Sequence, residues 1–403
     1  MNKEYKVPLI RDAFRNEKEI RKKLADFILN VDRFSMGDKT IQWEKEFAKW
    51  HERKYSIFVN SGSSANLLMI QSLLNIGFLK KGDKVGFTCL TWSTNVMPLI
   101  QLGLRPIPID IDPRTLNNSL KEIESVHSKH KDLKCIFLTN VLGMSDAIDL
   151  IAEYCQESKI ILLEDNCESL GSKYKGKLLG NFSLASTVST FLGHHLSTIE
   201  GGFVLTDNEE LYLDLLAARS HGWSRSWPNR IKAEKREELN ISTFHEPYTF
   251  FTIGMNLRPM EIQSFIGIDQ LKYLNDSIDY RFNFIIKMQK ILENSLIRTF
   301  FNESMNIISA FAVPLIFRNN LEKELGLNYF KSAGIEIRPI ISGNIINQPF
   351  AKKYFEVESH LYPNSEMADK YGFYFTCRPD LNKEEEIIIE KTLKALVNQL
   401  NKA

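Results

Sequence analysis

Short apolar runs alternate with helix-forming stretches over the first two-thirds of the chain. The expected strands are Tyr55–Val59, Lys84–Phe87, Leu104–Ile109, Cys135–Leu138 and Lys159–Leu163. A Ser/Gly turn and an expected helix over Ala65–Leu74 follow the first strand. Near-continuous apolar strands separated by helices are typical of a parallel sheet that is covered on both faces. Ligands of such sheets bind at the carboxyl ends of the strands, and the last of these runs ends in Glu164 and Asp165.

The pattern changes in the last third of the chain. It predicts a long helix over Leu271–Glu293, a strand over Ala310–Phe317 and a final helix over Glu384–Asn398. We therefore expect an α/β protein with a large domain over residues 1–275 and a smaller C-terminal α+β domain over residues 276–403. An N-terminal helix is expected to pack on the smaller domain.

Three stretches have an unusual charge pattern. Val85–Leu104 and Leu178–Ile199 carry no formal charge, but polar residues and glycine interrupt them, so we assign both to a buried sheet and not to a membrane span. The polar stretch Ser224–His245 contains Pro228 and is expected to form a mobile loop or lid.

Composition favours a soluble enzyme. The 403 residues are 43% apolar and 25% charged, with a net charge of +1, which indicates neither nucleic acid nor an anionic membrane as a partner. The first residues contain no apolar signal segment. The five cysteines lack the CxxC spacing of zinc or redox sites: Cys89, Cys135, Cys155, Cys167 and Cys377. We expect reduced thiols and a cytoplasmic protein.

Three segments are candidates for binding an anionic ligand with an aromatic ring. Ser63 and Ser64 lie in a turn that opens a helix, where free N–H groups and hydroxyls can hold a phosphate, although such turns also serve as ordinary caps. Asp165 can pair with a pyridinium nitrogen or simply cap a turn. Trp92 can stack on a planar ring or belong to the core.

Three histidines are further candidates. His194 and His195 are adjacent in sequence, and neighbours rarely share a face, so we do not expect a metal site there. An imidazole can, however, move a proton near neutral pH. His221 can serve a ligand or be a satisfied core residue.

The order and spacing of these motifs resemble the DegT/DnrJ/EryC1/StrS family of sugar enzymes that use pyridoxal phosphate (PLP). The matching stretches cover most of the chain: 34–37, 61–65, 164–165, 190–202, 219–222, 254–258, 270–271 and 338–344. In the fourth stretch, the relatives' cofactor-binding lysine lies six residues before the position of Glu200. This sequence has His194 there.

The resemblance implies a fold-type I aminotransferase-like fold with a mostly parallel sheet, and roles for individual residues. The implied cofactor-binding residues are Ser63, Ser64 and Ser189 for the phosphate, Trp92 and Asp165 for the ring, Glu168 near the ring oxygen, and Asn256 from a partner subunit. The implied substrate-binding residues are Arg219, His221, Arg338 and Asn344. For any one of the latter, a surface or interdomain ion pair is an equal alternative. A homodimer with shared active sites follows from the role of Asn256.

The missing lysine resembles the lysine-free 3-dehydratase branch of the family. One part of that branch carries an iron–sulfur cluster on four cysteines, and the other acts without iron on GDP-4-keto-6-deoxy-D-mannose. No cysteine lies in Gly222–Trp227, which favours the iron-free part.

The resemblance to that part implies that this chain uses pyridoxamine phosphate (PMP) held non-covalently, with His194 as the catalytic proton carrier. We expect L-glutamate to regenerate PMP and ammonia to be released, in the biosynthesis of 3,6-dideoxysugars for O-antigen and lipopolysaccharide. A nucleotide-sugar 4-aminotransferase and an inactive binding relative are the alternatives. The first needs a lysine in this region, yet none lies between Lys177 and Lys232.

Overall fold

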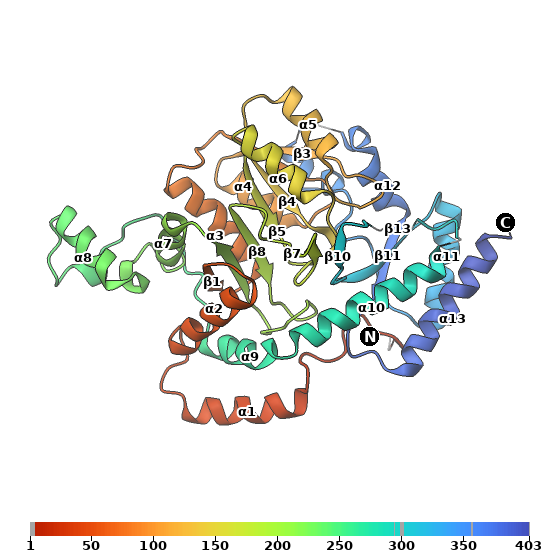
Figure 1. The fold of residues 1–403 in the computed structure, drawn as a ribbon, viewed down its shortest axis with the longest axis horizontal. Helices are drawn as coiled ribbons and strands as arrows, with labels where there is room; N and C mark the ends of the chain where they lie inside the picture. Colours follow the sequence, from red (N-terminus) through yellow and green to blue (C-terminus); the bar gives the residue numbers. More distant parts are fainter. Residues whose placement is uncertain (1–4, 294, 299–301, 356–357, 403) are drawn as a thin grey trace.

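A mostly parallel sheet forms the centre of the computed structural model, which describes residues 5–293, 295–298, 302–355 and 358–402 (Figure 1). In this part of the chain the sheet has the order β1-β9-β8-β5-β4-β2-β3. Its strands are β1 (Tyr55–Val59), β2 (Lys84–Thr88), β3 (Arg105–Ile109), β4 (Leu133–Thr139), β5 (Ile161–Asp165), β8 (Ala185–Ser189) and β9 (Gly202–Thr206). β9 is antiparallel to both neighbours, and the remaining strands run in one direction. The predicted α/β fold class is thereby confirmed.

Helices cover both faces of this sheet, and others lie outside it. The described α-helices are α1 (Glu17–Asn30), α2 (Asp38–Trp50), α3 (Gly62–Asn75), α4 (Met97–Gln101), α5 (Leu120–Lys129), α6 (Ile148–Glu157), α7 (Glu209–Ala218), α8 (Asn229–Glu238), α9 (Glu261–Leu271), α10 (Leu274–Leu292), α11 (Asn320–Ala333), α12 (Pro363–Tyr371) and α13 (Lys383–Leu400). Alternate side chains of β4 show the division. Cys135 and Phe137 pack with α3, α4 and α7, whereas Ile136 and Leu138 pack with α5 and α6. Both faces are buried, which explains the continuous apolar run in the sequence.

A smaller antiparallel sheet lies in the C-terminal part. It consists of β11 (Ala312–Ile316), β13 (Gly372–Thr376) and β12 (Ile337–Arg338), with β13 in the middle. A third, short sheet joins β6 (Lys173–Tyr174), β7 (Lys177–Leu178) and β10 (Met305–Ile307).

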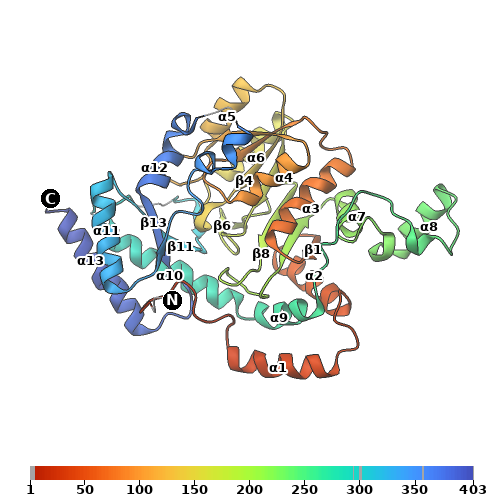
Figure 2. The same ribbon diagram turned by 180° about the vertical axis from the view of Figure 1, so that it is seen from behind.

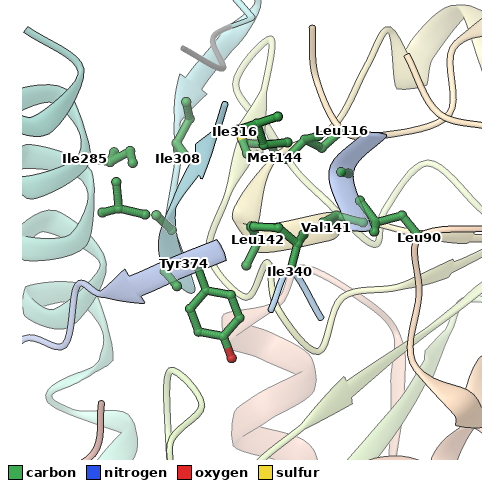
Figure 3. Close-up of a cluster of buried hydrophobic side chains, with 14 of the residues drawn as sticks. Leu90, Leu116, Val141, Leu142, Met144, Ile285, Ile308, Ile316, Ile340 and Tyr374 are labelled. Carbon is green, nitrogen blue, oxygen red and sulfur yellow. The ribbon is translucent and has the colours of Figure 1, made fainter. Parts of the chain in front are cut away.

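One apolar cluster connects the C-terminal part with the large sheet. Figure 3 shows Ile340 of the C-terminal part beside Val141 and Leu142, which follow β4, and Ile316 beside Met144. Tyr374 lies at the edge of this cluster, with its hydroxyl pointing away from it. The continuous packing fixes the small sheet against the carboxyl ends of the central strands, where ligands of such sheets bind. The domain division near residue 275 stays a prediction.

The N-terminal helix does not lie where we expected it. α1 packs against α9, with Phe27 stacked on Phe265 at 4.4 Å between ring centroids. The stretch before the helix makes the contact with the C-terminal part, because Val7 pairs with Ile335. A short extended segment therefore takes the place that the prediction gave to a helix.

The stretch 224–245 is also more regular than predicted. It contains α8, which projects from the body of the molecule and has no buried residue (Figures 1 and 2). Lys, Arg and Glu are good helix formers, and the pair Arg230–Glu234 at 2.8 Å supports the helix from one turn to the next. The polar composition and Pro228 had predicted a loop or lid for this stretch, and not a helix.

The uncharged stretch 85–104 folds as β2, a short 3-10 turn and α4. Among the described residues, no helix has both the length and the apolar character needed to cross a membrane.

The contact between α2 and α9 depends on Gly267. A Cβ atom at this position would lie 2.4 Å from Cε2 of Trp43, which is fully buried. We expect Gly267→Ala to lower the free energy of unfolding by about 1–3 kcal/mol, although alanine is the better helix former, because the overlap forces the tryptophan to move. Urea unfolding measures this. Ser128→Ala on exposed α5 serves as the control, and equal stability of the two variants would contradict the packing argument.

Candidate active site

A cavity of about 370 Å³ lies at the carboxyl ends of the central strands, against the small sheet. Thr139, Asp165 and Ser189 end β4, β5 and β8 and line it together. Seven of the predicted site residues line the cavity: Ser63, Trp92, Asp165, Glu168, Ser189, His194 and Arg338. The parallel strands explain this convergence, since their carboxyl ends meet at one edge of the sheet.

His194 has a defined tautomer. Its Nδ1 lies 2.7 Å from the carbonyl oxygen of Cys167, and a carbonyl can only accept, so Nδ1 carries the proton and Nε2 the free lone pair. Burial lowers the pKa of His194 below its ordinary value, although the bond to Cys167 opposes this effect. The ring of Phe311 packs against the imidazole, with centroids 5.1 Å apart. His194 is therefore a neutral base held in one orientation.

Asp165 is a buried carboxylate without a cationic partner in the described part of the chain. Its Oδ2 accepts hydrogen bonds from Asn66 at 2.9 Å and Asn95 at 2.7 Å, and its Oδ1 accepts one from the backbone N–H of Cys167 at 2.9 Å. Thr187 on β8 donates to the Asn66 carbonyl at 2.6 Å and fixes that amide. A buried charge of this kind fits a positively charged ligand in the cavity.

The N-terminus of α3 forms an anion cradle with β8 and β9. A Cβ on Gly62 would lie 2.7 Å from Cβ of Ser189, and one on Gly202 would lie 2.6 Å from the Gly62 nitrogen. Only glycines allow these segments to approach so closely, which brings the Ser189 side chain to the helix start beside Ser63. Free N–H groups and the helix dipole favour a phosphate there. Ser64 itself does not line the cavity. Its backbone N–H donates a hydrogen bond to the Ser61 hydroxyl oxygen at 3.0 Å.

Two further side chains flank the space between the cradle and His194. Trp92 is a large apolar residue with 54% of its surface exposed, and it lines the cavity, as expected for a ring that stacks on a ligand. Glu168 accepts a hydrogen bond from the backbone N–H of Leu142 at 2.9 Å. Burial raises the pKa of Glu168 to about 7, with a further contribution from the charge of Asp165.

Two predicted substrate-binding residues lie elsewhere. Arg219 is 2% exposed and forms an ion pair with Glu44 and a 2.6 Å hydrogen bond with the Phe58 carbonyl. Asn344 is fully buried, and its Oδ1 accepts from the backbone N–H of Ile346 at 3.2 Å. Neither residue lines the cavity, and the contacts of both side chains favour a structural role. Substrate contact stays a prediction for both.

His221 and Asn256 lie next to each other but outside this cavity. Ser220 and Asn256 form a bridge between two chain segments, and the His221 ring lies 5.2 Å from that of Trp223. The side chain of Asn256 is exposed. Its predicted contact through a dimer interface stays a prediction.

Sequence reasoning missed several residues of the site. Asn66 and Asn95 hold Asp165, and Arg281 and Tyr374 line the cavity from the C-terminal side. Asn66 follows the Ser/Gly turn and Asn95 follows Trp92 at close spacing, which is a weak signal. Arg281 lies in a helix of ordinary composition, so only the fold brings it to the site.

The fold and the cavity together place the chain among fold-type I PLP enzymes. In this class a carboxylate keeps the pyridine ring protonated, and a helix N-terminus binds the phosphate. Asp165 and the cradle at Ser63 fit these needs. The described residues that line the cavity include no lysine.

The chain belongs to the DegT/DnrJ/EryC1/StrS aminotransferase family, whose sequence profile matches residues 15–393. Two similar proteins are GDP-4-keto-6-deoxy-D-mannose 3-dehydratases. The one from Yersinia pseudotuberculosis is 35% identical over 93% of this chain and 94% of its own. The one from Escherichia coli O55:H7 is 37% identical over 88% and 92%. A crystal structure of GDP-4-keto-6-deoxymannose-3-dehydratase with a trapped PLP-glutamate geminal diamine has a TM-score of 0.85 and 34% identity, covering 96% of this chain and all of that one. The family resemblance seen in the sequence is thereby confirmed.

The raised pKa of Glu168 predicts a pH-dependent stability. Because the folded protein binds this proton more tightly than the unfolded chain, whose glutamate titrates near 4.5, the contribution is complete below pH 4.5 and is lost as the pH rises to about 7. We expect Glu168→Gln to lose less stability than the wild type between pH 4.5 and 7.5, by about 2 kcal/mol. Urea unfolding without cofactor at several pH values measures it. Glu153→Gln, at an exposed position, should follow the wild type. Parallel curves for all three proteins would refute the assignment.

Proposed function

We propose that the chain is a PLP/PMP-dependent 3-dehydratase of a nucleotide-linked 4-keto-6-deoxy sugar, with GDP-4-keto-6-deoxy-D-mannose as the substrate and L-glutamate as the amino donor. The observation that carries the proposal is His194, a neutral imidazole at the position of the relatives' lysine. It lines the cavity next to Asp165 and the phosphate cradle. The similarity to the two 3-dehydratases supports the same substrate and C3 deoxygenation.

The cofactor would be held without a covalent bond. Ser63, Ser189 and the start of α3 would bind its phosphate, Asp165 its ring nitrogen, and Trp92 one face of the ring. Glu168, with its raised pKa, would donate a hydrogen bond to the ring oxygen. When bound, the cofactor supplies an electron sink for breaking a bond next to its amine carbon.

His194 performs both proton transfers in this proposal. Nε2 is the basic nitrogen, so it can take a proton from the bound cofactor and return it to the C3 hydroxyl, which then leaves as water. A lysine at this position would compete by binding the cofactor covalently. The bond from Nδ1 to the Cys167 carbonyl persists when Nε2 is protonated, because both ring nitrogens then donate. The same residue can therefore act first as base and then as acid without turning its ring.

Arg338 is the remaining candidate for substrate contact from the C-terminal part. Its side chain is half-exposed, lines the cavity and lies 3.3 Å from Glu336. An arginine fork suits a carboxylate or a diphosphate, because it can donate to two oxygens at once.

The enzyme would act as a homodimer. Large apolar side chains are exposed on both sides of Asn256 in the sequence, at Phe250, Ile253 and Met260. Exposed apolar side chains that gather in one patch mark protein interfaces. A second copy bound there would cover them and bring Asn256 to the partner's cofactor phosphate.

The reaction products test the assignment. Purified protein incubated with PLP, L-glutamate and GDP-4-keto-6-deoxy-D-mannose should yield 2-oxoglutarate, ammonia and a sugar that has lost one oxygen, as measured by mass spectrometry. A 4-amino sugar that retains its C3 oxygen would instead establish an aminotransferase, and the absence of turnover together with the absence of PLP binding would establish an inactive relative.

Replacement of the proton carrier tests the mechanism. We expect His194→Asn to reduce the dehydration rate by about 10²- to 10⁴-fold, because the amide cannot carry a proton, while PLP binding stays close to that of the wild type. Stopped-flow absorbance gives the rate, and equilibrium dialysis gives the binding. His360→Asn, at an exposed position, is the matched control. A rate within threefold of the wild type would exclude His194 as the base.

A further inference from the structure

The extended segment before α1 connects the small sheet with the loop that carries His194. We call its residues 7–11 the N-terminal strap. Leu9 and Ile10 of this strap line the large cavity. Residues 9–15 and residues 193–197 also line one small cleft together, so the segment runs beside the loop. The proposed chemistry gives the strap no role.

Hydrogen bonds hold the strap on the small sheet. Val7 is fully buried, and its carbonyl accepts from the backbone N–H of Glu336 at 2.9 Å. The N–H of Leu9 donates to the Glu336 carboxylate at 2.8 Å, and the carbonyl of Leu9 accepts from the Thr376 hydroxyl at 3.3 Å. Ile10 therefore follows a residue whose main chain is fixed on both sides.

Ile10 packs on Gly193, the residue before His194. A Cβ on Gly193 would lie 2.7 Å from Cδ1 and 3.1 Å from Cγ1 of Ile10, so the end of the isoleucine fills the space that a side chain would need. Gly193 also has a φ of +102°, which glycine adopts at little cost. Both features require a glycine here, and together they bring the strap against the main chain of the loop.

Gly193 belongs to the turn that leads into His194. The His194 N–H donates to the Phe191 carbonyl at 3.0 Å, and Gly193 is the third of these four residues, where a type II turn needs a positive φ. The bond to Cys167 sets the orientation of the imidazole. The turn sets the position of the main chain that carries it.

We propose that Ile10 is a positioning residue, which holds the turn 191–194, and with it His194, in a fixed place relative to the small sheet. Glycine has more conformational freedom than any other residue, so a turn built on it is a weak support by itself. The strap adds the support, because it is bonded to the small sheet at Leu9 and covers Gly193 with an apolar side chain.

The position of the turn matters for proton transfer. Nε2 of His194 has to reach two different atoms, and a displacement of about 1 Å can cost about 10²-fold in rate. This consequence for the rate rests on the proposed function. The contact between Ile10 and Gly193 does not.

Hydrogen exchange without substrate tests the contact, whatever reaction the protein catalyses. Ile10→Ala removes both atoms that lie on Gly193. We expect the backbone amides of residues 191–196 to exchange about tenfold faster, because the turn opens more often, while those of β4 keep the wild-type rate. Mass spectrometry of proteolytic peptides measures both. Unchanged exchange in 191–196, or an equal rise in β4, would overturn the proposal.

Two further variants sharpen this test. Ile10→Val removes Cδ1, the atom nearest to Gly193, and should give a smaller rise in exchange than Ile10→Ala. It takes the place of Ile10→Ala if that variant does not fold, and wild-type exchange would then count against the contact. Ile387→Ala makes the same substitution at a position of α13 that is 48% exposed, and residues 191–196 should keep the wild-type rate in it. An equal rise in this control would contradict a specific role of Ile10.

Kinetics test the positioning role. We expect Ile10→Ala to lower kcat of the dehydration about tenfold, and Ile10→Val to lower it less, with PLP affinity within about twofold of the wild type. A lower kcat together with faster exchange in 191–196 supports the role, and a wild-type kcat with faster exchange refutes it. If the wild-type protein does not dehydrate the sugar, the proposed function fails, and the exchange measurement still decides whether Ile10 holds the turn.

Discussion

The active site depends on the backbone of a single residue, Cys167. Its N–H donates to Asp165 and its carbonyl accepts from His194, so one residue joins the carboxylate at the end of β5 to the imidazole on another loop. Backbone groups of a buried turn move little, and neither bond requires a side chain to give up rotamer freedom. The distance between the two functional groups is thus set by the main chain. Burial, followed by the charge of Asp165 and a hydrogen bond to it, raises the pKa of the Cys167 thiol, so the thiol stays protonated beside that carboxylate.

A second constraint is the cost of burying charge in this cavity. Asp165 and Arg281 are both buried, without an oppositely charged side chain bonded to either in the described part of the chain. Neutral amides and carbonyls hold them instead. Such hydrogen bonds offset the loss of hydration but do not neutralise the two charges. A ligand that carries the opposite charges is therefore favoured in the cavity. The site is therefore prepared for a bound zwitterionic cofactor, at the expense of the stability of the empty protein.

The sequence predicted the features that depend on a local residue pattern. It failed for features that depend on contacts between residues far apart in the chain. The apolar runs located five strands of the central sheet, but not the antiparallel β9 or the helix α8. Ser63 and Asp165 follow strands and meet by topology, which could be predicted. The roles given to Arg219 and Asn344 came from family position alone, and both side chains are buried away from the cavity. Their burial could not be predicted, because no local pattern records which side chain a neighbouring element covers. Arg281 was missed for a related reason: it lines the cavity, but no local pattern in the sequence marks it.

The replacement of the relatives' lysine by His194 changes both how the cofactor is held and which group moves protons. A lysine would hold the cofactor covalently and could also move protons, whereas a histidine can only move protons, so non-covalent contacts must supply all of the binding. In the proposed function, the anion cradle, Asp165 and Trp92 supply those contacts, and all three line the cavity. In return, the imidazole has a fixed direction, given by its bond to Cys167, and a lowered pKa that keeps it basic yet uncharged. A flexible ammonium group has neither property. Removal of a hydroxyl needs one group that takes a proton and returns it at a fixed point, and this geometry meets that requirement better than it meets the needs of an aminotransferase.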